Sequence, residues 1–387
     1  MSSITVCIMV KNEEDILEDC IKSVYGNVEE ILVIDNGSSD NSVSIAQKYK
    51  CKVIHAPDAT EAEGRNLFFK YATSSWLLVL DADERIEVDS IMRIRSVINK
   101  TDNSTFGYRL PEYQYIGNGK WAAIDIFRLI KNDKRIKYAE RKLHTSPTDS
   151  IHDFKGNMGK LTDTPIHHFD ILFKLRTPAK REKYLKKLIE EVDKSKDPHM
   201  MSYLGIEYMA INELNKAENL FKKSLDLDYE QLTKSRLYLA ILYVKLGMLK
   251  EAERETKELI NLGRPSLEDR AFSLLADIAF RNGDYNNAEY YCRKALNYDP
   301  FGAHNYLNLA FILSDKNPSE AINLLYEAVR KNPYLNNKEI YKQGQLPNIY
   351  SFQSSFLSSF PNAIELHLNL CKKLSICEDF YTLRECH

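Results

Sequence analysis

Hydrophobic residues follow two different patterns along this chain. Between residues 3 and 100, short apolar runs alternate with segments in which apolar residues recur every three or four positions. The runs span 4–10, 31–34, 52–55 and 76–80 and predict buried strands, whereas the recurring positions predict helices. This alternation predicts an α/β domain with a mostly parallel sheet and right-handed crossovers. Runs at 106–110 and 124–130 predict two further strands.

The pattern changes near Thr177. From there to about residue 335 the chain has no strand-like run, and four near-repeats each carry an alanine at a similar place. These alanines are Ala217, Ala252, Ala288 and Ala321, which are 35, 36 and 33 residues apart. A period near 34 with Gly-x-Tyr-x-x-Ala and Asp-Pro endings resembles the tetratricopeptide repeat. We therefore expect an all-α solenoid, which is either pure support or a docking surface for a peptide or protein.

These patterns divide the 387 residues into three expected parts. Residues 1–176 are predicted to form the α/β domain, 177–335 the helical repeats, and 336–387 a helical cap or dimerisation segment. A homodimer is expected as one possibility, because the last part contains apolar residues that no other feature explains. These residues are Phe352, Phe356, Leu357 and Phe360.

Composition narrows the classes of function. The net charge of −2 gives no electrostatic argument for nucleic acid or an anionic membrane as a partner. No apolar run approaches the roughly 18 residues that a membrane span needs, and the N-terminus lacks the pattern of a signal peptide. Seven cysteines without a CxxC pair are typical of a reducing compartment, so a cytoplasmic location is expected.

Two carboxylates follow the fourth predicted strand, in the segment Asp81-Ala82-Asp83. Ligands of open α/β sheets bind at the carboxyl ends of strands. A hard divalent cation takes carboxylate oxygens at such a place together with oxygens of a phosphate-bearing ligand. The alternative is that Asp83, Glu84 and Glu87 begin a helix and complement its dipole.

Polar segments also follow the other predicted strands. Lys11-Asn12-Glu13 follows the first strand, Asp35 to Asp40 the second, and Glu63-Gly64-Arg65-Asn66 opens the third helix. Because the carboxyl ends of parallel strands meet at one edge, we expect these segments near Asp81 and Asp83.

In this order, the four features resemble the family 2 glycosyltransferases, whose nucleotide-binding half-Rossmann fold is called GT-A. With the helical repeats, the chain resembles the sublancin-type bacteriocin S-glycosyltransferases. Its first hundred residues are also similar to lipopolysaccharide-core glucosyltransferases, which share the ending Asp81 to Arg85.

The resemblance implies roles for individual residues. Asp35 would hold the base or ribose of a nucleotide sugar. Arg65 would place positive charge near the diphosphate or sugar, unless it only pairs with Glu61 or Glu63. The implied nucleotide-sugar site comprises Val10, Lys11, Asn12, Glu13, Asp35, Ser38, Arg65, Asp81, Ala82, Asp83 and Trp121. Trp121 would stack on a sugar or acceptor, with a plain core role as the alternative.

A metal site is implied as well. Asp83, with Asp81 nearby, would bind Mg²⁺ or Mn²⁺, and the ion would offset charge on the leaving diphosphate. The resemblance points to His168 rather than His167 as a third ligand. The alternative is that both are ordinary hydrogen-bonded histidines.

The second half of the domain carries one departure from the family pattern. Phe127-Arg128-Leu129 and then Leu143-His144-Thr145-Ser146-Pro147 resemble Phe-Arg-Leu … Val-His-Glu-x-Pro, but Thr145 stands where the family has Glu. The candidate replacement bases are His144, Asp125, Glu140, Asp149 and Asp153. A thiol ionises more readily than a hydroxyl, which favours a cysteine acceptor.

The resemblance implies a metal-dependent, inverting glycosyltransferase. It would move a hexose from a nucleotide diphosphate sugar, with UDP-glucose as the first choice, to a peptide side chain, Cys first and Ser second, as in bacteriocin modification. The peptide would dock partly on the helical repeats. The alternatives are a lipopolysaccharide-core or other glycan transferase, and a non-catalytic repeat scaffold, which Thr145 favours and the acids Asp81 and Asp83 disfavour.

Overall fold

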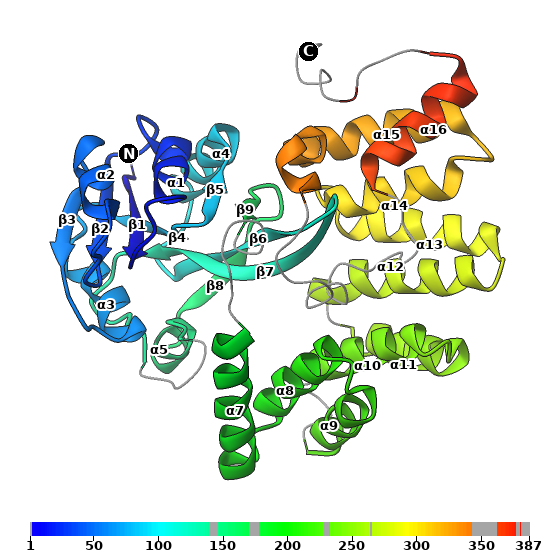
Figure 1. The fold of residues 1–387 in the computed structure, drawn as a ribbon, viewed down its shortest axis with the longest axis horizontal. Coiled ribbons are helices and arrows are strands. Elements are labelled where there is room, and N and C mark those ends of the chain that lie inside the picture. Colours follow the sequence, from blue (N-terminus) through cyan, green and yellow to red (C-terminus); the bar gives the residue numbers. More distant parts are fainter. Residues whose placement is uncertain are drawn as a thin grey trace. The chain divides into compact units, whose positions relative to one another are not determined.

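The computed structural model describes residues 2–139, 145–169, 178–227, 233–263, 265–342, 362–376 and 380. The chain divides into two compact units (Figure 1). The first comprises Met1–Gln114 and Ala123–Phe173, and the second comprises Tyr115–Ala122 and Lys174–His387. Within the described ranges, no helix has the length and apolar character needed to cross a bilayer.

The first unit is built on a mixed sheet in which four neighbouring strands on one side, β3, β2, β1 and β4, are parallel. The strands are β1 (Ile4–Val10), β2 (Glu30–Asp35), β3 (Lys52–His55), β4 (Trp76–Asp81), β5 (Glu84–Ile86), β6 (Thr105–Gly117), β7 (Lys120–Lys131), β8 (Asn157–Lys160) and β9 (Ile166–His168). Their order is β3-β2-β1-β4-β7-β6-β9-β5, with β8 beside β6. β1 to β4 pair in parallel, and β7 runs antiparallel to β4. The four strands predicted from the apolar runs are confirmed, as is the α/β class.

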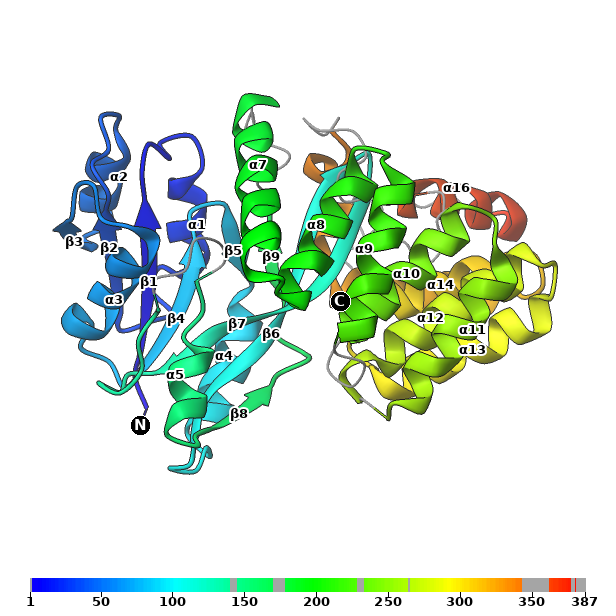
Figure 2. The same cartoon turned by 90° about the horizontal axis from the view of Figure 1, so that it is seen from below.

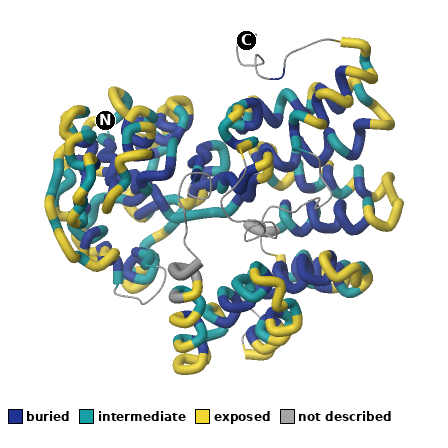
Figure 3. Tube along the Cα trace, viewed as in Figure 1, coloured by how far each residue is buried: buried dark blue, intermediate teal, exposed yellow. Residues whose placement is uncertain are grey.

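Helices cover both faces of this sheet. The helices of the first unit are α1 (Leu17–Val24), α2 (Ser42–Lys48), α3 (Glu61–Tyr71), α4 (Val88–Ile98) and α5 (Thr148–Asp153). Val6 and Ile8 of β1 share a buried cluster with residues of α1 and α4, whereas Cys7 shares one with Phe68 of α3. Because both faces are covered, β1, β2 and β4 are buried over nearly their whole length (Figure 3), which explains their continuous apolar runs, whereas β3 at the edge is partly exposed.

The second unit is helical apart from the segment that β6 and β7 contribute. Its elements are α7 (Pro178–Ser195), α8 (Pro198–Ala210), α9 (Leu214–Leu227), α10 (Thr233–Lys245), α11 (Leu249–Asn261), α12 (Pro265–Arg281), α13 (Tyr285–Tyr298), α14 (Ala303–Leu313), α15 (Pro318–Lys331), the 3-10 turns η1 (Pro333–Asn336) and η2 (Lys338–Tyr341), and α16 (Ala363–Leu374). Packing joins α8 with α9, α10 with α11, α12 with α13, and α14 with α15 (Figure 2).

The repeat alanines mark equivalent places in these pairs. Ala217, Ala252, Ala288 and Ala321 are each the fourth residue of the second helix, and all are 0% exposed. Gly283, with φ of 75°, supplies the left-handed turn between α12 and α13. The prediction of a tetratricopeptide-like solenoid is confirmed. The apolar residues expected at a dimer contact, Phe352, Phe356, Leu357 and Phe360, lie outside the described residues.

The loop between β6 and β7 is tied to the end of the helical array. Tyr115 donates through its hydroxyl to Asn332 Oδ1 (2.7 Å). The N–H of Gly119 donates to the Ile340 carbonyl (2.9 Å). Gly119 has φ of 72°, and a Cβ there would lie 2.4 Å from the Tyr341 ring, so a side chain cannot replace it without rearrangement.

Ala288→Leu is expected to destabilise the repeats by about 1–3 kcal/mol, because three extra carbon atoms must enter a fully buried position. Urea unfolding monitored by circular dichroism measures this change. Asn286→Leu, at an exposed site on the same helix, is the matched control and should change stability by less than about 0.5 kcal/mol. Equal effects of the two substitutions would contradict a close-packed helix pair at Ala288.

Candidate active site

The turns after β1 and β2 are tied to each other at the carboxyl edge of the sheet. Asn12, with φ of 58°, accepts a hydrogen bond from the Ser39 N–H at its Oδ1 (2.8 Å), and its own N–H donates to Ser38 Oγ (3.1 Å). The Glu13 N–H donates to Ser42 Oγ (2.8 Å). Asparagine tolerates the left-handed backbone region better than most residues. The two turns therefore form one preorganised wall.

Asp35 ends β2 beside this wall, opposite Val10 in the strand register. Its Oδ1 accepts from the Ser38 N–H (2.9 Å), and its Oδ2 lies 3.1 Å from His55 Nδ1. Burial alone would raise the pKa of Asp35, but the hydrogen bonds from Ser38 and His55 outweigh it, so the pKa is lowered. Asp35 is thus an ionised carboxylate at the sheet edge.

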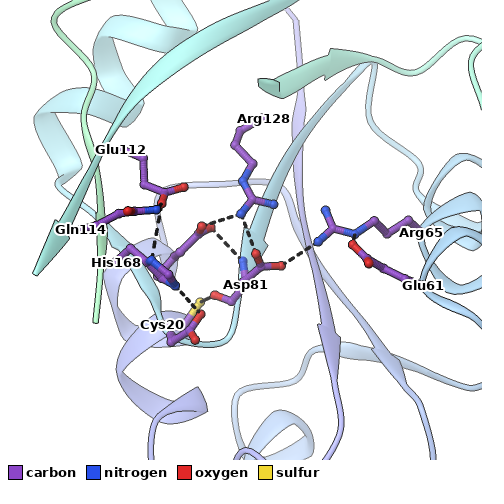
Figure 4. A network of polar contacts seen from close by, with 10 residues as sticks. Cys20, Glu61, Arg65, Asp81, Glu112, Gln114, Arg128 and His168 are labelled. Atoms are coloured by element: carbon purple, nitrogen blue, oxygen red, sulfur yellow. Dashed lines mark hydrogen bonds and ion pairs between the residues drawn. The ribbon is translucent and has the colours of Figure 1, made fainter. Parts of the chain in front are cut away.

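Asp81, at the end of β4, is held by two arginines (Figure 4). Its Oδ1 accepts from Arg65 Nη2 (3.0 Å) and its Oδ2 from Arg128 Nη2 (2.5 Å). The same nitrogen of Arg128 lies 2.5 Å from Glu84 Oε1. Arg65 also pairs with Glu61 through Nε (3.1 Å), whereas Glu63 closes the capping box of α3 with Thr60. The Asp81 side chain remains 36% exposed, so it can still meet a ligand.

The surroundings of Asp81 and Glu84 shift the pKa values of their carboxyl groups in opposite directions. Burial would raise the pKa of Asp81, but the guanidinium groups of Arg128 and Arg65 lower it to about 2. Burial raises the pKa of Glu84 to about 8, and the Arg128 guanidinium offsets this only in part. The two guanidinium groups therefore favour the ionised form of Asp81, whereas burial favours the protonated form of Glu84.

Asp83 and His168 face each other on the other side of Asp81. His168 Nε2 lies 3.5 Å from Asp83 Oδ1, and His168 Nδ1 lies 3.4 Å from Glu112 Oε1 (Figure 4). Strand pairing fixes this arrangement, because His168 is opposite Glu84 on β5 and Gln114 on β6. Burial would lower the pKa of His168, but Asp83 and Glu112 raise it to about 10.

The donor atoms of Asp83 and His168 fit a divalent cation. Two atoms bound about 2.1 Å from one ion lie about 3.0 Å apart when they are neighbours in an octahedron. The observed 3.5 Å is within about half an ångström of that separation. A carboxylate with an imidazole is a donor set that suits Mn²⁺ or Mg²⁺ with ligand oxygens completing the shell.

The structure brings together most of the predicted nucleotide-sugar residues. Val10 pairs with Asp35 and Met9 with Asp81, so the ends of β1, β2 and β4 lie at one level. Arg65 reaches the same edge from α3. Asp83 and Glu84 do not begin a helix, because β5 intervenes and α4 starts at Val88. The alternative reading of these two acids as a helix N-terminus is therefore wrong.

Other predicted residues lie elsewhere. Trp121 belongs to the second unit, where its ring packs edge-on against His304 with centroids 6.1 Å apart. Asp125 forms an ion pair with Lys160 (3.0 Å). Asp149 and Asp153 lie on α5. The other two candidate bases, Glu140 and His144, lie outside the described residues.

Four residues of this edge were missed by sequence reasoning: His55, Glu84, Glu112 and Arg128. The motif Phe127-Arg128-Leu129 predicts no role for Arg128 by itself. For Glu84 the sequence suggests only the start of a helix. His55 and Glu112 carry no motif, and only strand pairing brings them to Asp35 and His168.

The metal-free protein is expected to lose stability as pH rises from about 6.5 to 8. Burial raises the pKa of Glu84 to about 8, and Asp83 and Glu112 raise the pKa of His168 to about 10, so both exceed their ordinary values. In this window the folded state binds more protons than the unfolded state, so unfolding becomes easier as pH rises, by up to about 1.4 kcal/mol per pH unit for each group. Thermal melts in EDTA test this, with Glu84→Gln/His168→Gln flattening the slope. An unchanged slope in that double variant would contradict the assignment.

Comparisons with known proteins agree with this geometry. Residues 5–160 match the family described as Glycosyl transferase family 2. A TPR repeat-containing protein of Synechococcus elongatus is 30% identical over 152 residues, which are 39% of this chain and 37% of that protein. The SPbeta prophage-derived glycosyltransferase SunS of Bacillus subtilis is 23% identical over 257 residues, 64% of this chain and 58% of that protein. The lipopolysaccharide core biosynthesis glycosyltransferase LpsC of Rhizobium meliloti is 22% identical over 209 residues, which are 51% of this chain and 74% of that protein.

The chain spans 37% and 58% of the lengths of the first two of these relatives. Residues 5–160 form a glycosyltransferase family 2 domain, and tetratricopeptide-like helices follow it. The resemblance drawn from the four strand-end motifs and the repeats is confirmed at this level.

Proposed function

We propose that this protein is a cytoplasmic, metal-dependent, inverting glycosyltransferase that moves a hexose from a nucleotide diphosphate sugar to a peptide side chain. The observation that carries the proposal is the pair formed by Asp83 and His168, 3.5 Å apart, beside the arginine-bound Asp81 at the carboxyl edge of a parallel sheet. UDP-glucose is the first donor to test, and a cysteine the first acceptor.

In this proposal each edge residue has a distinct task. Asp35 accepts hydrogen bonds from the base or ribose, next to the wall of Lys11, Asn12, Glu13 and Ser38. Asp83 and His168 hold Mg²⁺ or Mn²⁺, which would offset the charge that develops on the leaving diphosphate. Both oxygens of Asp81 already accept guanidinium groups, so we assign it to anchoring Arg65 and Arg128 rather than to direct metal ligation. Arg65 then offers positive charge to the phosphates or sugar.

The acceptor step needs a base or an acceptor that is already acidic. The carboxylate of one candidate base, Asp125, is already engaged in an ion pair with Lys160 (3.0 Å). A thiol, with a pKa near ~8.5, needs less help than a hydroxyl. The repeats would hold part of the peptide, which a small acceptor would not require.

Intact-mass spectrometry tests this function. Candidate peptides in matched Cys and Ser versions are incubated with the protein, Mn²⁺ and a panel of UDP- and GDP-sugars. A hexose-sized gain on one version supports the proposal and identifies donor and nucleophile. Transfer to a glycan or lipid and to no peptide would overturn the peptide acceptor.

A glycan acceptor is the second candidate. The similarity to LpsC, a protein named for lipopolysaccharide core biosynthesis, covers 74% of that protein and favours it. The same incubation with core oligosaccharides in place of peptides decides between the two acceptors, because the donor site is common to both.

A further inference from the structure

We infer that Glu112 is a positioning residue that sets the ring orientation and tautomer of His168 for metal binding. This inference rests on the proposed function, because it takes His168 as a ligand of the divalent ion. Glu112 lies in β6 and belongs to no motif that the sequence analysis describes. Its carboxylate is 4% exposed, and its Oε1 is 3.4 Å from His168 Nδ1.

The two ring nitrogens of His168 have different neighbours. Nε2 faces Asp83, on the side where the ion would bind, and Nδ1 faces Glu112. A histidine that binds a metal through one nitrogen carries its remaining proton on the other. A carboxylate that accepts this proton's hydrogen bond fixes the tautomer and increases the basicity of the ligating nitrogen. Glu112 is placed to do this for Nδ1.

The Glu112 carboxylate is itself held in place. Gln114 donates through Nε2 to Glu112 Oε1 (2.6 Å), and both residues belong to β6, which pairs in parallel with β9. In that pairing Glu112 is opposite Ile166 and Gln114 is opposite His168. The carboxylate is therefore fixed by the strand that also fixes the histidine.

The other buried acid near His168 is already engaged. Glu84 Oε2 accepts from the Asp81 N–H (2.9 Å), and Glu84 Oε1 is bound by Arg128 (2.5 Å). The sheet therefore gives the two acids separate partners: Glu84 supports Arg128 and Asp81, whereas Glu112 supports His168.

The test is the affinity for Mn²⁺ in the presence of UDP, measured by electron paramagnetic resonance of the free ion. Glu112→Leu is expected to weaken Mn²⁺ binding by about 10- to 100-fold. Glu112→Gln keeps the size and one acceptor oxygen, so it should weaken binding less. Glu30→Leu removes another hydrogen-bonded carboxylate, partly buried and at the opposite end of the sheet's strands, and should leave the affinity unchanged. Circular dichroism confirms that each variant is folded.

A second readout separates positioning from a structural role. In spectra of nitrogen-15 histidine-labelled protein with Mg²⁺ and UDP, the Nδ1 proton of His168 should resonate far downfield in the wild type, less so in Glu112→Gln, and should lose this shift in Glu112→Leu. If Glu112→Leu folds poorly, Glu112→Gln decides, since wild-type Mn²⁺ affinity together with a wild-type Nδ1 proton shift in that variant contradicts the inference.

Two negative results have different meanings. Wild-type Mn²⁺ affinity in both Glu112 variants, or an unchanged shift of the His168 Nδ1 proton in Glu112→Leu, overturns the inference alone. No Mn²⁺ binding by the wild-type protein with UDP overturns the metal site of the proposed function as well.

Discussion

Asp83→Asn is expected to remove metal-dependent binding of a nucleotide sugar while the fold survives. The amide keeps the size of the side chain but loses the charge that a divalent cation requires. A metal contributes several kcal/mol of transition-state stabilisation in such reactions, so transfer should fall by about 100- to 1,000-fold. Calorimetric titration of UDP with and without Mn²⁺ measures the binding, and release of UDP measures the reaction.

Stability should change little in this variant. Asp83 stands near the acids Asp81 and Glu84, so losing one negative charge relieves repulsion while it removes the partner of His168. Asp89→Asn, an exposed acid in the first turn of α4, is the matched control and should bind UDP with Mn²⁺ as the wild type does. If Asp83→Asn binds UDP with Mn²⁺ as strongly as the wild type does, Asp83 is not a ligand of the ion.

The fold was predictable where one local pattern decides the structure. The runs at 4–10 and 76–80 are apolar on both faces, which identifies strands buried between two layers of helices. The repeat alanines were equally informative, since a position that recurs near every 34 residues and must stay small identifies packed helix pairs. The boundaries of β6 and β7 were less predictable, because the apolar runs at 106–110 and 124–130 are only parts of strands of 13 and 12 residues.

The site was predictable only as a set of strand ends. The sequence places Asp35 and Asp81 at one edge, because parallel strands share their carboxyl ends. The sequence does not show which charged side chains contact each other at this edge, because those contacts depend on the register between strands that are distant in the sequence. Arg128 is 47 residues from Asp81 and reaches it because β7 pairs with β4.

The two adjacent histidines illustrate the same limit. Neighbouring residues of a strand point to opposite faces. His167 is 0% exposed and packs edge-on against Tyr113, with ring centroids 5.8 Å apart, whereas His168 faces Asp83. Spacing alone cannot choose between the two, because the choice depends on how β9 lies between β5 and β6.

Arg128→Met is expected to cause the largest loss of stability, about 3–5 kcal/mol. Arg128 is 9% exposed and bridges Asp81 and Glu84 with contacts of 2.5 Å. Methionine fills much of the same volume, but it leaves Arg65 as the remaining described cation on Asp81 and removes the donor to Glu84 Oε1, and taking one partner out of a buried charged contact is strongly destabilising. Urea unfolding followed by Trp76 fluorescence, in a Trp121→Phe background, reports on the first unit because Trp76 is then the only tryptophan.

Replacing Glu84 as well should restore part of this loss at high pH. In Arg128→Met/Glu84→Gln, the amide still accepts from the Asp81 N–H and cannot ionise beside Asp81, so the double variant should be more stable than Arg128→Met by about 1–3 kcal/mol at a pH above about 8. Arg128→Lys should fall between Arg128→Met and the wild type, because one ammonium group does not reproduce the planar guanidinium that spans two carboxylates. If Arg128→Met unfolds within about 1 kcal/mol of the wild type, water must reach Asp81 and Glu84, and Arg128 would serve the donor site without stabilising the fold.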